Sequence, residues 1–200
     1  MRLPHPSSFD PALTDAILGF FARNILEVYD STLATLQTQD DNNYVRGTAT
    51  FGRTHQRFLN LILNHQCPTP VTLLDRSLKL TFQIGESECR FFEDDYLHPR
   101  KSGFFKRSAN YELFSIDSDF PAYWSFVIVR SETLDDEIRI VFVGYNLYHQ
   151  PVSFWEYDAA DGSLSLATPI TPAPVDIGSA PIGDLDEDQQ DDHVNESNRG

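Results

Sequence analysis

The sequence predicts an α+β fold in which an N-terminal helical hairpin packs on a mainly antiparallel meander sheet of about six to seven strands. Up to about residue 64, apolar residues recur every three or four positions, whereas from residue 71 they tend to alternate. Aromatic residues make up 12% of the chain, with 15 Phe and 8 Tyr against one Met, which favours strands. Because the helices come first and the strands follow, the class is α+β.

Two helices account for the helical part, residues 10–66. Asp10-Pro11 is a typical helix start, because a carboxylate caps the first turn and proline is tolerated at its first position. An apolar face continues this helix to about residue 36, and the polar run 39–43 ends it. A second helix is expected over about 48–64, and the short link makes the pair an antiparallel hairpin.

The sheet part covers residues 71–168. The expected strands are 71–84, 88–96, 111–116, 123–130, 138–145, 152–157 and 164–167. Gly85–Ser87 is a plausible hairpin turn, and Asp161-Gly162 is the strongest hairpin signal. No helix-length link separates the strands, so pairing should be mainly antiparallel. The segments 124–129 and 138–143 are apolar on both faces; one face should pack on the helices, and a sheet bend or a partner should cover the other.

The chain changes character near residue 169, which divides it into a single domain, 1–168, and a terminal extension, 169–200. The extension combines a Pro-rich spacer with an acidic run too polar to bury a core, so we expect a disordered tail. Six acids lie within residues 184–192: Asp184, Asp186, Glu187, Asp188, Asp191 and Asp192. The net charge of −15 argues against nucleic-acid binding over the whole surface and favours a protein partner with a basic surface.

Signatures of cofactor, metal and membrane chemistry are missing from the sequence. The six histidines form no metal-binding pattern, and neither Cys67 nor Cys89 belongs to a CxxC pair. No serine elbow and no glycine-rich phosphate loop occur. We therefore expect no cofactor, no metal and no membrane span, and a cytoplasmic protein with reduced thiols; pairing of the two cysteines has no support in the sequence.

The segment 98–107 is the first candidate binding site. It holds four of the 15 basic residues and no acid, and it places Phe104-Phe105 between the charges. The candidate contacts are His98, Arg100, Lys101, Lys106 and Arg107. These residues could bind a partner or an anion, or pair with the acidic run 93–95. Alternatively, the segment is a solvated hairpin tip that its phenylalanines anchor to the core.

A row of arginines on the second helix is the second candidate. Arg46, Arg53 and Arg57 are seven and four positions apart, so they project from one side of the helix. They could contact an acidic partner or the acidic tail, or form the ordinary polar face of an amphipathic helix. Asp117 and Asp119 could share a divalent cation, but acids in such a position are typical turn formers.

These features favour a non-enzymatic interaction module: an acidic neutraliser, adaptor or regulatory subunit that binds a basic partner. The profile is like that of antitoxin and immunity proteins in composition, not in any motif. One alternative is an enzyme acting on phosphate esters or nucleic acid through residues 98–107. Another is a structural subunit of a larger assembly that uses an exposed aromatic sheet face.

Overall fold

The computed structural model of the chain describes residues 3–101, 104–105, 119–129 and 138–158. The expected strands 111–116 and 164–167, the Asp161-Gly162 turn, and the spacer and acidic tail of 169–200 lie outside these residues. Within them the α+β prediction is confirmed, because two long helices precede a sheet of six strands.

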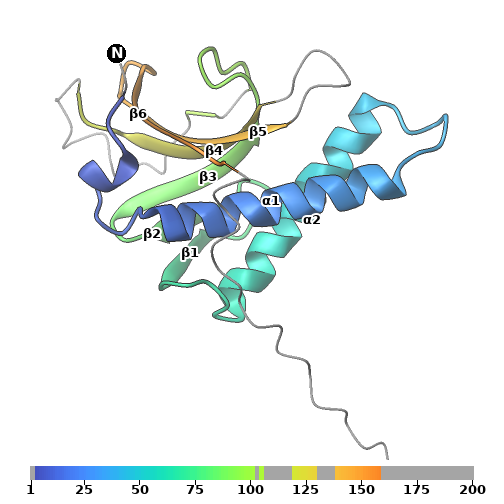
Figure 1. The fold of residues 1–200 in the computed structure, drawn as a ribbon, viewed down its shortest axis with the longest axis horizontal. Helices are drawn as coiled ribbons and strands as arrows, with labels where there is room; N and C mark the ends of the chain where they lie inside the picture. The colour runs from blue at the N-terminus through green and yellow to red at the C-terminus, as the bar shows by residue number, and fades with distance from the viewer. Residues whose placement is uncertain (1–2, 102–103, 106–118, 130–137, 159–200) are drawn as a thin grey trace, which may run out of the picture. The chain divides into compact units, whose positions relative to one another are not determined.

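The two helices form the expected hairpin, with shifted starts. Helix α1 spans Asp15–Thr35 and helix α2 spans Asn43–Leu63, and α2 returns diagonally across α1 (Figure 1). The predicted start of α2 near residue 48 is too late. The side chain of Asn42 accepts a hydrogen bond from the Val45 N–H and caps the helix there, so helical structure includes part of the expected polar stop.

The predicted start of α1 at Asp10-Pro11 is wrong, because Asp10 has another role. Its buried carboxylate accepts hydrogen bonds from the N–H of Ala12, the N–H of Glu86 and the hydroxyl of Ser87, at 2.9, 2.9 and 2.7 Å. It therefore ties the segment before α1 to the turn at residues 85–87. Gly85 has a φ of +59°, and a Cβ there would lie 2.5 Å from that of Ala12, so glycine is required at this close approach.

The six strands lie side by side in chain order. They are β1 (Val71–Asp75), β2 (Thr81–Ile84), β3 (Ser87–Glu93), β4 (Tyr123–Val129), β5 (Arg139–Tyr145) and β6 (Pro151–Glu156). The single strand expected over 71–84 is thus two. Asp75 accepts the Ser77 N–H at 2.8 Å, and the Ser77 carbonyl accepts the Leu80 N–H, so a turn forms between β1 and β2.

One strand pair departs from the expected meander. β3 and β4 pair in parallel, whereas the other four neighbouring pairs are antiparallel. The mainly antiparallel prediction rests on short links, and the link between these two strands is long. The whole span 94–122 connects β3 to β4, and its length allows the chain to return to the starting end of the sheet.

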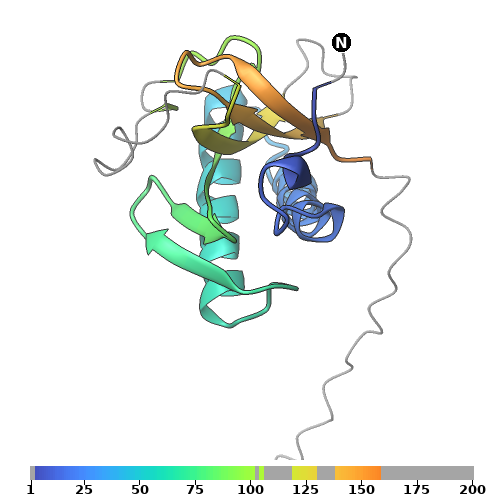
Figure 2. The ribbon, with the colours of Figure 1, turned by 90° about the vertical axis from the view of Figure 1, so that its left-hand side faces the viewer.

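Both faces of the sheet are apolar, as the sequence predicts, and each has its own core. The inner face packs on α1 and α2, and the sheet curves around this helix pair (Figure 2). Buried members of the inner core include Ile17, Phe21, Phe58, Phe82, Phe126 and Phe142. The outer core consists of Phe104, Val127, Val141, Val143 and Tyr145. A segment of the same chain that contains Phe104 therefore covers these residues of the outer face.

Candidate functional site

The described part of the basic segment folds around an acid of its own chain. Asp94 follows β3, and one oxygen of its carboxylate accepts the backbone N–H groups of Arg100 and Lys101 at 2.9 and 2.8 Å. A bound anion would need these two backbone N–H groups as donors, and Asp94 already accepts both of them. The side chains of both residues are exposed, and the imidazole of His98 lies 3.4 Å from the carboxylate of Asp95. Lys106, Arg107 and Asp117 lie outside the described residues.

Phe104 and Phe105 anchor this segment to the outer face. Phe104 is 2% exposed and stacks on Phe92 of β3, with ring centroids 4.4 Å apart. Phe105 meets Tyr145 edge-on and stacks on His149, with centroids 3.8 Å apart and nearly parallel planes. Phenylalanines that interrupt a basic run here serve as anchors to the core, which agrees with the simpler interpretation of the segment.

His149 is not among the site residues that the sequence predicts. It lies in the turn between β5 and β6 with a φ of +64°, a conformation that costs a non-glycine residue free energy. Asn146 builds the turn by accepting the N–H groups of Tyr148 and Gln150 on its side chain. The exposed imidazole lies flat on Phe105, which explains why a histidine can replace the glycine that such a turn prefers. No sequence signal links the two residues, because they are far apart along the chain.

The arginine row on α2 faces α1. Arg46 donates to the carbonyl of Leu36, Arg53 to the hydroxyl of Thr32, and Arg57 to the side chains of Asn24 and Glu27. These contacts lie along the length of the helix pair, so the arginine row forms the polar contacts between the two helices. The arginines are half-buried or exposed, and parts of their guanidinium groups reach solvent.

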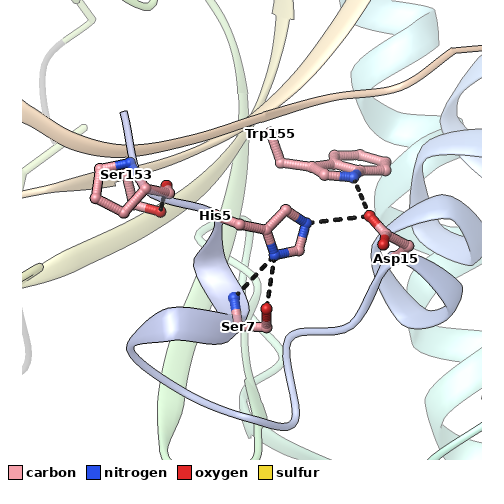
Figure 3. A network of polar contacts seen from close by, with 6 residues as sticks. His5, Ser7, Asp15, Ser153 and Trp155 are labelled. Carbon is pink, nitrogen blue, oxygen red and sulfur yellow. Dashed lines mark hydrogen bonds and ion pairs between the residues drawn. The ribbon is translucent and has the colours of Figure 1, made fainter. Parts of the chain in front are cut away.

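A second polar network holds the N-terminal segment in place (Figure 3). The Nδ1 atom of His5 accepts the Ser7 N–H at 3.1 Å and lies 2.8 Å from the Ser7 hydroxyl. Because a backbone N–H is always a donor, Nδ1 is unprotonated and Nε2 donates to Asp15 at 3.0 Å. The indole of Trp155 donates to the same carboxylate oxygen of Asp15 at 2.8 Å.

This Ser–His–Asp chain has distances that a nucleophile and its base would also show. Its surroundings favour a structural role. The Nδ1 lone pair of His5 is shared with the Ser7 backbone N–H, and the Asp15 side chain is 80% exposed. The network joins the first turn of α1 to β6, so we interpret it as a structural tie for residues 3–9.

The two thiols are protected, and they are not paired with each other. Both cysteines are free; Cys67 is half-buried and Cys89 is buried. Burial raises the pKa of Cys67 to about 11 and holds the pKa of Cys89 well above its usual value, so neither is a thiolate at neutral pH. Across the described ranges, no three His, Cys, Asp or Glu side chains gather in a way that could hold a metal ion.

The described helices also lack the combination of length and apolar content that crossing a lipid bilayer requires. Comparison with protein-family models, with curated proteins and with solved structures finds no match for this chain.

Proposed function

We propose that this protein is a non-enzymatic interaction module, an acidic adaptor, neutraliser or regulatory subunit that recognises a basic protein. The observation that carries the proposal is uncompensated negative charge. Half of the 30 acidic residues lie in the described ranges together with ten of the 15 basic ones, so the remaining chain has three acids for each base. Such a field attracts a basic partner over several ångströms and speeds its encounter.

The described polar groups support the same proposal. His5, Asp10, Asp94 and the arginine row of α2 use their hydrogen-bonding atoms to hold segments of the fold together. Exposed carboxylates such as Asp30 and Glu86 have no side-chain partner among the described residues and can contribute to recognition. The alternative of a structural subunit that uses an exposed aromatic sheet face has less support, because residues of the same chain cover the aromatic outer face over β4 and β5.

The test is capture of binding proteins from an extract of the native host by the immobilised full chain. Basic proteins should bind at about 50 mM salt and be released at about 500 mM, because screening weakens the attraction. A full-length variant in which the six acids of residues 184–192 become Asn or Gln should bind the same partner more weakly and with a smaller salt dependence.

A variant with residues 184–192 in scrambled order keeps the charge and is the matched control. It should bind like the natural chain if charge dominates recognition. Retention of no basic protein at either salt concentration would overturn the proposed function.

A further inference from the structure

The two edges of the sheet differ in whether another described segment forms hydrogen bonds with the edge strand. At the β6 edge, the carbonyl of Pro4 accepts the N–H of Phe154 at 3.2 Å and the hydroxyl of Ser153 at 3.0 Å. The N-terminal segment therefore covers this edge, and the His5–Asp15 network fixes it there (Figure 3). β1, at the other end of the sheet, pairs with β2 on one side and with no other strand of the described residues.

β1 has an anchored face and a solvent-facing one. Val71 and Leu73 are half-buried and pack against the inner core, which holds the strand in position. Leu74 lies at a bulge in the pairing with β2 and is 50% exposed, and Leu78 in the following turn is 76% exposed. An edge whose backbone groups pair with no other described strand, next to exposed leucines, is the type of surface to which an extended peptide adds as a further strand.

We propose that the open edge of β1 binds an extended segment of a partner protein that bears lysine or arginine, by strand addition. This inference rests on the proposed function and names the surface that performs it. Backbone hydrogen bonds to β1 supply the shared recognition, and Leu74 and Leu78 meet apolar side chains of the added strand.

The net negative charge of the chain favours binding of a basic segment over binding of a second copy of this chain. Two copies would each bring a net charge of −15 and repel, whereas a basic segment is attracted. Arg76 and Lys79 lie in the turn after β1, so they disfavour cations at that end. Val71 pairs with Ile84, and Glu86 follows in the next turn, so the added segment should place its cations near the Val71 end.

The experiment uses the full chain and a capped probe peptide of about ten residues in which Lys and Val alternate. The valine amides of the probe are N-methylated, which leaves one hydrogen-bonding edge and limits self-association to pairs of peptides. A second peptide, with every amide methylated, has the same charge and side chains but cannot add to a sheet. A third carries Glu in place of Lys. Titration calorimetry measures affinity, and hydrogen exchange locates the contact.

The probe should bind and slow exchange of the Val71–Asp75 amides, and the fully methylated and Glu peptides should bind at least about tenfold more weakly. Leu74→Lys should weaken binding of the probe by about tenfold, because it places a like charge on the edge. Leu97→Lys is the matched control, since Leu97 is 51% exposed elsewhere, and it should bind like the natural chain.

Equal binding of the fully methylated peptide, unchanged exchange of β1, or no binding at millimolar probe would overturn the inference. A dimer of the natural chain that Leu74→Lys dissociates would also overturn it, in favour of a second copy. If a basic host protein is captured and Leu74→Lys captures it equally well, this inference fails while the proposed function stands.

Discussion

The inner and outer faces of the sheet have similar apolar strands but different covers. On the inner face, Phe21 of α1 packs on Phe58 of α2 and on Phe82 of β2, with ring centroids 4.8 and 4.9 Å apart. On the outer face, Val127 and Val141 are fully buried under a segment without helix or strand structure at Phe104. Burial is therefore as complete on one face as on the other, and the difference lies in what holds each cover in place.

The helices that cover the inner face form their own backbone hydrogen bonds. The cover of the outer face, which comprises the described residues 94–101 and 104–105 and is called the outer cover here, depends instead on individual contacts. Asp94 accepts backbone N–H groups, the Tyr145 hydroxyl donates to the Tyr96 carbonyl at 2.8 Å, and Phe105 stacks on His149. Burial, assisted by the nearby carboxylates of Asp94 and Asp95, raises the pKa of Tyr145, so this hydroxyl stays a donor at neutral pH. A cover held this way should open locally, before the inner core unfolds.

The largest expected effect tests this difference directly with two buried phenylalanines. Phe21→Ala should lower the free energy of unfolding by about 3–5 kcal/mol, because it leaves a cavity among four aromatic neighbours. Phe104→Ala should cost less globally, because the loss cannot exceed the free energy that opens the outer cover. Urea denaturation measures the free energy of global unfolding. Hydrogen exchange at Val127 and Val141 measures the free energy of local opening at the outer face.

In the Phe104→Ala variant, exchange at those two valines should speed up more than exchange at inner-face positions such as Phe82. Equal global losses for the two substitutions, with uniform acceleration of exchange, would show that the two faces unfold together.

The second effect concerns how the inner cover is joined to the sheet. Asp10→Ala should destabilise the fold by about 2–4 kcal/mol, because it leaves the N–H groups of Ala12 and Glu86 without their acceptor. Asp15→Ala is the control, since its exposed carboxylate also accepts two hydrogen bonds yet should matter much less. Thermal unfolding of both variants compares them, and equal shifts would contradict the role given to Asp10.

The sequence predicted the inner face better than the outer one, for a physical reason. Periodicity reports which side of an element is apolar, so the helix pair, β4 and β5 were found from the sequence. The start of α1 was harder to predict, because a helix cap depends on a single side chain. Asp10 instead binds the turn at residues 85–87, and this contact joins segments that are distant in the sequence. The Asp75–Ser77 turn was a local signal that an apolar reading of 71–84 overlooked.

The candidate site was less accessible to sequence reasoning. Charge and aromatic content identified the segment 98–107, but nothing local showed that Asp94 would take its backbone donors or that His149 would stack on Phe105. Whether a strand lies at an edge depends on the order of the whole sheet, so the place of β1 at the edge of the described strands could not be foreseen.

The third effect is a pair of substitutions at His149 on the outer face. His149→Ala keeps the unfavourable positive φ and loses the ring stack, so it should cost about 1 kcal/mol. His149→Gly loses the same stack but relieves the backbone, so it should be close to neutral. Urea denaturation and exchange at Val141 follow both variants. A glycine variant less stable than the alanine variant would contradict a strained backbone at this position.

The smallest effect is a pH dependence confined to the outer cover. The Leu97 N–H, which donates to Asp95 at 2.8 Å, is the main cause that holds the pKa of Asp95 below its usual value of 3.8. A lowered pKa in the folded state means that the carboxylate contributes stability above pH 3.8, which is lost as the pH falls through the folded value. The contribution should be small, because Asp95 is exposed.

Asp95→Asn removes this titration and leaves the rest of the chain unchanged, so it isolates the effect of one carboxylate. Exchange at Val127 should accelerate between about pH 4 and pH 3 in the natural chain more than in the variant, after correction for intrinsic rates. Exchange at Phe82, on the inner face, should show the same pH dependence in both proteins. If Asp95→Asn altered both faces equally, the outer cover could not be an independently opening unit, because its local charge would be coupled to the whole core.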